Sequence, residues 1–244
     1  GWEQAAAECA RLDMTFIGGM EITAKGPTGG GIHLLAYLFD PEEESLLNAV
    51  NQTLADRIPR AQEMVDRLSR VYELTWQDVL DEAVGVSVGK PHIAAAMIKR
   101  GHIESKDVFH NELVTYGTEF YVPSPGLAID RAIALVRGAG GVPITAHPTA
   151  RNQPGRVMPR ETMVQLREIG LGGFELDHPD NHNNPEGLAR LREYAAEFNL
   201  IVTGSSDYHG TNKEKIPGER TTEPEMLMRI IDEATGYAPI YPAS

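Results

Sequence analysis

The second half of the chain follows one pattern, in which short apolar segments alternate with segments of helical periodicity. Each helical segment places apolar residues three or four apart, as at Met163, Leu166 and Ile169. Strands that alternate with helices pair in parallel, because each helix carries the chain back across the sheet. The pattern therefore predicts an α/β fold with a parallel sheet, open or closed. Strands are expected at 142–146, 174–176 and 200–203, and helices at 129–136, 163–169, 185–198 and 223–234.

The first half of the chain is less regular, and charged helical segments dominate it after residue 40. Thr75 has Asp78 three residues later, which is the pattern of a capping box at the start of a helix. Another helix is expected to start at Pro91, because proline suits the first helical position. Before these, a helix is expected at 2–12 and strands at 15–23 and 32–39.

Charge and cysteine content exclude several classes of protein. The 244 residues hold 22 Lys and Arg against 35 Asp and Glu, a net charge of −13. Bulk charge therefore does not favour binding to duplex nucleic acid, and a phosphate partner would need local attraction such as bound metal ions. Cys9 is the single cysteine, which excludes an intrachain disulfide and fits a cytoplasmic protein. Neither a signal peptide nor a membrane span is predicted.

Ionisable residues lie in or just after the expected strands. In a parallel barrel, the carboxyl ends of the strands converge on one face. Histidine and carboxylate are ligands for zinc, manganese and iron, and bound metal can activate water to attack a phosphate ester. The pattern therefore predicts a metal site at that face. The residues in question are Glu21, His33, His147, His178, Asp207 and His209.

Each of these residues also has a simpler structural interpretation. His147 precedes Pro148 and suits a loop, and Asp207 in its polar segment suits a turn. His178 and His182 have the setting of a surface loop, while a strand glutamate such as Glu21 is costly to bury without a partner. Two further histidines, His102 and His110, are expected to be solvated.

Four segments resemble the PHP (polymerase and histidinol phosphatase) family of phosphoesterases. They are GGMEIT at Glu21, GIHLLAYLFDP at His33, GGVPITAHP at His147 and VTGSSDYHGTNK at Asp207. KPHIAAAMIKRGHI at Lys90 and GFELDHPDNH at Glu175 resemble the stand-alone bacterial branch. Members of that branch act on nucleoside 3′,5′-bisphosphates and on the 5′ ends of short RNA. The similarity runs in order over nearly the whole chain.

The resemblance implies a distorted (β/α)7 barrel with a trinuclear centre of manganese, zinc or iron. It implies a barrel at 1–53 and 120–244 that lacks its first strands, and a helical insertion domain at 54–119. The motif match makes Glu21 a bridging carboxylate and leaves His178 as a residue that lines the pocket. The further metal ligands implied by the match are His33, His147, Asp207 and His209.

The family's opening H-x-H motif and its T-D-H-D segment do not occur in these 244 residues. In relatives, a Gly-Trp pair and an alanine-rich helix follow T-D-H-D, and here that pair is Gly1 and Trp2. We therefore expect the missing ligands to lie upstream of Gly1. The predicted activity is that of the intact protein.

Two segments are candidates for phosphate binding. Gly89, Lys90, Pro91 and His92 open a helix, and a helix start offers unpaired backbone N–H groups to an anion. Lys90 would add charge and His92 a donor, although a capped surface helix explains the segment equally well. Arg151 is a second candidate on the barrel side.

The predicted function is hydrolysis of nucleotide phosphates by metal-activated water, with His209 and Asp207 as catalytic residues. The expected substrate is a nucleoside 3′,5′-bisphosphate, or a short single-stranded oligonucleotide trimmed from its 5′ end. Two alternatives stay open. One is a small-molecule phosphatase of the histidinol-phosphate type, and the other is a metal-free binding module.

Overall fold

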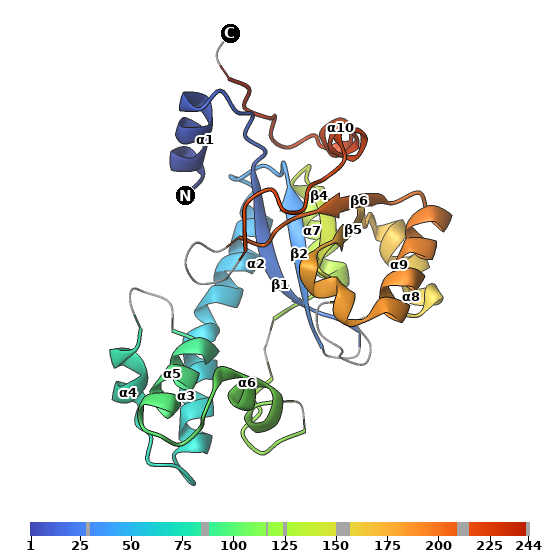
Figure 1. Cartoon of the computed structure of the whole chain (residues 1–244). Coiled ribbons are helices and arrows are strands. Elements are labelled where there is room, and N and C mark those ends of the chain that lie inside the picture. The colour runs from blue at the N-terminus through green and yellow to red at the C-terminus, as the bar shows by residue number, and fades with distance from the viewer. Residues whose placement is uncertain are drawn as a thin grey trace. The chain divides into compact units, whose positions relative to one another are not determined.

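The computed structural model divides the chain into two compact units, Gly1–Ala49 with Gly126–Ser244, and Val50–Pro125 (Figure 1). That the second unit is an insertion domain stays a prediction, as do its expected bounds of 54–119. Among the described residues, no helix combines the length and apolar character that a membrane crossing requires. The structure describes residues 1–27, 30–83, 88–115, 117–123, 126–149, 157–208 and 215–242.

The first unit is built on a six-stranded sheet of order β3-β1-β2-β4-β5-β6. The pairs β4–β5, β5–β6 and β1–β3 are parallel, which confirms the α/β prediction for the second half. However, β2 runs antiparallel to both neighbours. Its direction relative to β1 follows from the short connection at residues 26–30, because a parallel crossover needs about a dozen residues. The strands are β1 (Gly19–Lys25), β2 (Gly31–Tyr37), β3 (Leu127–Ala128), β4 (Val142–Ala146), β5 (Gly173–Asp177) and β6 (Ile201–Gly204).

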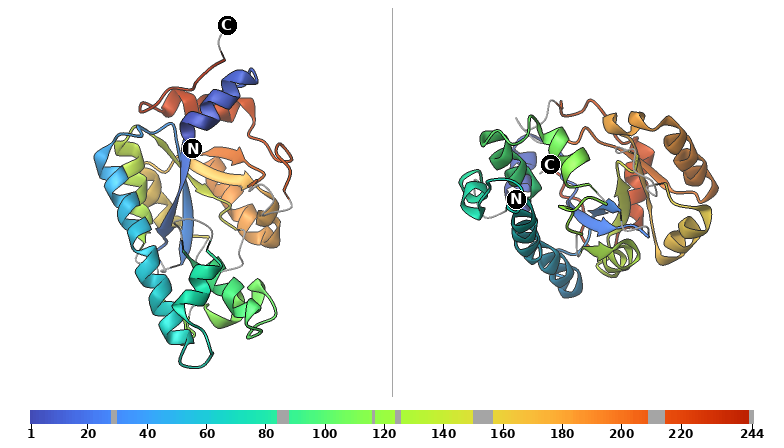
Figure 2. Two further views of the ribbon diagram at one scale, coloured as in Figure 1. Left: turned by 90° about the vertical axis from the view of Figure 1, so that its left-hand side faces the viewer. Right: turned by 90° about the horizontal axis from the view of Figure 1, so that it is seen from below.

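Helices pack against this sheet from both faces. The helices of the first unit that the argument uses are α1 (Trp2–Arg11), α7 (Ile129–Gly138), α8 (Arg160–Ile169), α9 (Pro185–Glu197) and α10 (Pro224–Glu233). Helix α7 contacts β1 to β4, and α9 contacts β5. Helix α10 lies beside β6 in both Figure 1 and Figure 2. Its Ile230 belongs to one buried cluster with Val142, Ile144 and Ile201.

Strand alternation decides which side chains can form a site. In β1, Ile22 and Ala24 are buried, so Glu21 and Thr23, which alternate with them along the strand, face the other way. Glu21 lies opposite Leu35 of β2, and Thr23 lies opposite His33. Glu21 and His33 therefore share one face of the sheet. They are diagonal neighbours two residues apart in register, which is within reach of long side chains.

The second unit is helical and has its own apolar core, which includes Leu68, Ile93, Met97 and Phe109. Its elements are α3 (Arg57–Leu68), α4 (Trp76–Asp81), α5 (Lys90–Lys99), α6 (Lys106–Val108) and a π-helical turn at Phe109–Leu113. Helix α2 (Glu44–Ala55) runs across the boundary between the two units. The helix expected from Pro91 begins one residue earlier, at Lys90.

The predicted capping box is confirmed at the start of α4. Thr75 Oγ1 accepts the Asp78 N–H at 3.2 Å, and Asp78 Oδ2 accepts the Thr75 N–H at 2.8 Å. Hydrogen bonds from Thr75 and then Arg100 lower the pKa of Asp78 to about 2. The ionised carboxylate therefore stabilises the folded state above its ordinary pKa of 3.8, and this stabilisation is lost as the pH falls through about 2.

Removing this cap should weaken the second unit. Thr75→Ala is expected to lower the free energy of unfolding by about 1 kcal/mol, because the Asp78 N–H loses its acceptor. Denaturant titration followed by the fluorescence of Trp76, the first residue of α4, measures the change. The matched control is Thr75→Ser, which keeps a hydroxyl acceptor and should unfold as the wild type does. Equal loss in both variants would contradict a capping role.

Candidate metal centre

Three of the predicted ligands meet at the edge of the sheet. Glu21 Oε1 lies 2.5 Å from Nδ1 of His33 and 3.8 Å from Nε2 of His147, and the two imidazole nitrogens are 3.4 Å apart. One ligand atom from each residue falls within 4.8 Å of the other two. The three residues come from β1, β2 and the turn after β4, so strand pairing brings them together. Their role as metal ligands stays a prediction.

The Glu21 carboxylate is held in its ionised form. Hydrogen bonds to His147 and His33 lower its pKa well below the usual range, against the opposing effect of burial. An ionised carboxylate between two imidazoles is a nitrogen and oxygen donor set that suits zinc, manganese or iron.

A second group of side chains lies next to the first. His178, Asp180 and Asp207 also offer ligand atoms within 4.8 Å of one another, and His178 Nε2 is 3.7 Å from Asp207 Oδ2. The rings of His147 and His178 lie 5.1 Å apart between centroids, so the two groups are adjacent. The structure thus joins five of the predicted site residues to Asp180, which the sequence did not single out.

The prediction of a surface loop at His178 is wrong, because its side chain is fully buried. Asn181 holds the loop against the sheet by donating to the carbonyls of Glu175 and Leu176 at 2.8 and 3.1 Å. His182, one residue further along, is exposed as expected.

Hydrogen bonding determines the tautomer of His178. Its Nδ1 accepts the backbone N–H of Asp180 at 3.1 Å, and burial lowers its pKa to about 4, so the ring is neutral near pH 7. The proton is therefore on Nε2, which is buried and has no hydrogen-bond partner among the described residues. A buried N–H without a partner is costly, and it suits a donor to a bound ligand better than a metal ligand.

Two of the predicted ligands have unusual backbone conformations. His147 has φ of 29° and Asp207 has φ of 52°, in the left-handed region that residues with a side chain rarely adopt. For His147 the strain is greater because Pro148 follows it. Such conformations persist where surrounding contacts hold them, and they often occur at functional sites.

Glu175, in the middle of β5, is a site residue that the sequence analysis missed. Its side chain is 3% exposed, and Oε2 accepts the backbone N–H of His147 at 2.9 Å. Burial raises the pKa of Glu175 to about 7. The GFELD segment carries the same sequence signal as Glu21, a carboxylate inside an apolar strand.

Among the described residues, the remaining candidates Lys90 and His92 are not part of these two groups. His209 and Arg151 lie outside the described residues. Lys90 and His92 belong to the second unit, where His92 Nδ1 accepts the Gly89 N–H at 3.1 Å and Lys90 Nζ lies 3.5 Å from the Val114 carbonyl. These contacts are those of a capped helix, and phosphate binding by the two residues stays a prediction. His102 and His110, which were expected to be solvated, are half-buried.

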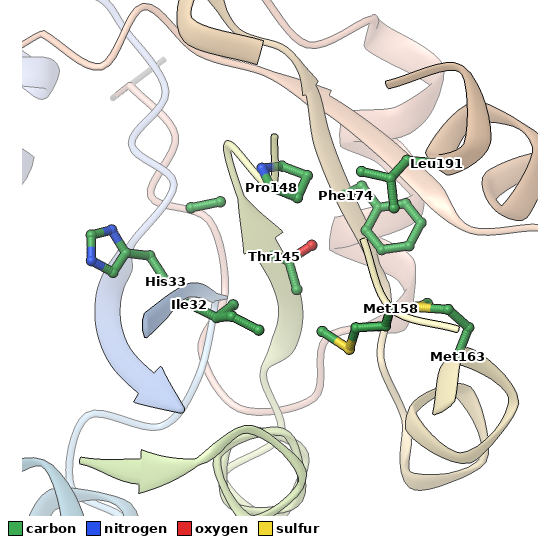
Figure 3. A pocket seen from close by; sticks show the side chains of 9 residues that line it. Ile32, His33, Thr145, Pro148, Met158, Met163, Phe174 and Leu191 are labelled. Carbon is green, nitrogen blue, oxygen red and sulfur yellow. The ribbon is translucent and has the colours of Figure 1, made fainter. Parts of the chain in front are cut away.

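A small apolar cavity lies behind His33, toward α8 and α9 (Figure 3). Its volume is about 10 Å³, enough for one water molecule at most, so it is not a nucleotide pocket. Figure 3 shows the His33 ring turned away from Met163, Phe174 and Leu191, which line the far side. The imidazole is therefore directed to the polar groups and not to this cavity.

The donor atoms fit a divalent metal. Glu21 Oε1, His33 Nδ1 and His147 Nε2 face one another at 2.5, 3.8 and 3.4 Å, so one carboxylate oxygen and two imidazole nitrogens form the donor set. Nitrogen and carboxylate oxygen are the donors that transition metals of this kind take.

Proteins with similar sequences act on phosphate esters. No family model matches the chain. A 5′-3′ exoribonuclease of Haemophilus influenzae is 26% identical over 209 residues, covering 86% of this chain and 75% of the relative. A phosphoribosyl 1,2-cyclic phosphate 1,2-diphosphodiesterase of Eggerthella lenta is 28% identical, with 82% and 75% covered. A 3′,5′-nucleoside bisphosphate phosphatase of Chromobacterium violaceum is 22% identical, with 90% and 74% covered.

A crystal structure agrees in both sequence and fold. It is that of a candidate metal-dependent phosphoesterase from Bifidobacterium adolescentis, with 33% identity and a TM-score of 0.82 over 96% of this chain and 82% of the other. The sequence identity extends over nearly the whole chain, and the same chain brings histidines and acids together at the end of its sheet. On these grounds the chain belongs to the PHP family of metal-dependent phosphoesterases.

Proposed function

We propose that this protein hydrolyses phosphate esters of nucleotides with the help of divalent metal ions. The observation that carries the proposal is the convergence of Glu21, His33 and His147 within 4.8 Å, beside a second group that contains Asp207. These residues come from separate strands or from the segments directly after them. Two buried imidazole nitrogens at the site, Nδ1 of His147 and Nε2 of His178, have no partner among the described residues. Such an arrangement is costly for a purely structural cluster.

The side chains of the chain have distinct roles in this proposal. Glu21, His33, His147 and Asp207 would hold the metal, which when bound polarises a phosphoryl oxygen and lowers the pKa of water. The two imidazoles would supply nitrogen ligands, and Glu21 supplies negative charge. His178 donates its Nε2–H to an oxygen of the phosphate that gains charge in the transition state.

Further roles in this proposal belong to residues that only the sequence analysis identified as candidates. His209 would act as a further metal ligand and as the donor of a proton to the leaving oxygen. Arg151 and, in the second unit, Lys90 and His92 are the predicted binders of phosphate groups that do not react. Histidine, lysine and arginine side chains all carry N–H donors suited to phosphate oxygens.

The preferred substrate in this proposal is a nucleoside 3′,5′-bisphosphate or a short RNA with a 5′ phosphate. Relatives of both kinds, at 22% and 26% identity, support it. A cyclic phosphodiester is the second candidate, because the relative at 28% identity acts on one.

The test uses the purified protein with manganese, zinc or iron. Phosphate or nucleotide release is measured with adenosine 3′,5′-bisphosphate, a 5′-phosphorylated tetranucleotide, phosphoribosyl 1,2-cyclic phosphate and histidinol phosphate. Release from either of the first two supports the proposal, and release from the last alone supports the small-molecule phosphatase. If no metal binds by elemental analysis and no substrate turns over, the metal-free binding module is favoured instead.

Replacing His178 should separate a donor from a metal ligand. His178→Phe keeps a ring of similar size but has no N–H, so kcat is expected to fall about 100-fold while the metal content stays unchanged. The matched control is His182→Phe, which makes the same change at an exposed histidine four residues away. A loss of metal in His178→Phe would show that the ring is a ligand.

A further inference from the structure

We infer that Glu175 is a positioning residue, which holds His147 in its metal-binding orientation through a hydrogen bond to the His147 backbone. The inference rests on the proposed metal site and adds a residue that does not itself touch metal or substrate. Its carboxylate Oε2 lies 2.9 Å from the His147 nitrogen. Glu175 is not in either group of candidate ligands.

The direction of the His147 side chain depends on an unfavourable backbone conformation. With φ of 29° and a proline next in the chain, His147 would relax to an extended conformation if nothing held it. In an extended strand, side chains alternate between the two faces, so such a relaxation would turn the imidazole away from Glu21. The hydrogen bond to Glu175 acts on the residue whose conformation is strained.

The turn after β4 is held at two points, and both partners come from β5 or the loop after it. Glu175 accepts the N–H of His147, and Oδ1 of Asn181 accepts the N–H of Thr149 at 3.0 Å. Asn181 in turn donates to the Glu175 carbonyl at 2.8 Å. Asn181 thus holds the turn at Thr149, whereas Glu175 holds it at His147, the proposed metal ligand.

Packing alone does not explain a glutamate at this position. The side chain is 3% exposed, and burial of a carboxyl disfavours folding unless its hydrogen bonds compensate. Apolar residues of similar volume often replace buried ionisable groups without loss of stability. Phe174 and Leu176, the neighbours of Glu175 in β5, are buried apolar residues of the ordinary kind. A buried carboxyl at this position is therefore better explained by what it holds in place.

The test compares an acceptor with a non-acceptor of similar size. Glu175→Gln keeps an oxygen that can accept the His147 N–H, and Glu175→Leu does not. Affinity for manganese and zinc is measured by calorimetric titration, stability by thermal unfolding in EDTA, and kcat and KM with adenosine 3′,5′-bisphosphate.

Glu175→Leu is expected to bind metal about 10- to 100-fold more weakly, without a lower unfolding temperature in EDTA. Glu175→Gln should stay within about threefold of the wild type, since its side-chain oxygen can still accept the hydrogen bond that orients His147. If the Leu variant fails to fold, Glu175→Asp takes its place, because its shorter side chain draws the acceptor back and should cause the same loss.

Three results would overturn the inference. Wild-type metal affinity in Glu175→Leu would show that the hydrogen bond is not needed. Equal loss in Glu175→Gln and Glu175→Leu would assign the effect to the charge. If the wild-type protein binds no metal, both this inference and the proposed function fail, whereas the first two results leave the proposed function intact.

Discussion

Glu21→Gln is expected to lower kcat/KM for metal-dependent phosphate release at least about 100-fold and to reduce the bound metal. Glutamine has nearly the same shape and can still contact His33, so the fold should persist. The variant removes the negative charge that lies 2.5 Å from one imidazole and 3.8 Å from the other. Elemental analysis and steady-state kinetics at several manganese concentrations measure the two effects.

The matched control is Glu3→Gln, which makes the same change at an exposed position of α1. It should leave metal content and activity at wild-type values. If Glu21→Gln retained both, Glu21 would be an ion-pair partner of the histidines and not a ligand.

Gly173→Ala is expected to lower the free energy of unfolding by at least about 2 kcal/mol, or about 4–8 °C in Tm. Gly173 starts β5 beside Ile201 of β6, and a Cβ there would lie 2.0 Å from the Ile201 carbonyl oxygen and 2.8 Å from its carbon. Both are backbone atoms, so no side-chain rotation relieves the clash and the two parallel strands must separate. Thermal unfolding followed by circular dichroism measures the change.

Gly138→Ala provides the comparison for this prediction. Gly138 ends α7, and a Cβ there meets nothing within 4 Å. Alanine favours the helix over glycine by about 0.5–1 kcal/mol, so this variant should be as stable as the wild type or slightly more stable. A Gly173→Ala variant of equal stability would contradict the close approach of β5 and β6.

Local sequence patterns predicted most of the regular elements. The strand expected at 142–146 is β4, and the helix expected at 223–234 is α10 at Pro224–Glu233. The capping box at Thr75 also formed as predicted. Periodicity and caps act over a few residues, so these features are readable without knowledge of distant contacts.

The convergence of candidate ligands was also expected from the sequence, for a topological reason. The carboxyl ends of parallel strands meet at one edge of a sheet, which accounts for His147 after β4. His33 reaches the same place from the first half of β2, where it pairs with Ala146 because β2 runs antiparallel to β4. The antiparallel direction of β2 was not predicted, because the strand–helix alternation that indicated a parallel sheet lies in the second half of the chain and does not include this strand.

The sequence by itself determined the α/β class, the strands and helices, and the strand positions of the first three ligands, because these depend on residues close together in the chain. Only the tertiary structure decided that β2 runs antiparallel to β4, that His178 is buried and that Glu175 reaches the His147 backbone. Each of these depends on contacts between segments far apart in the chain. Burial in particular is a property of the neighbours that a folded segment acquires, and a loop of polar letters such as DHPDNH does not reveal them.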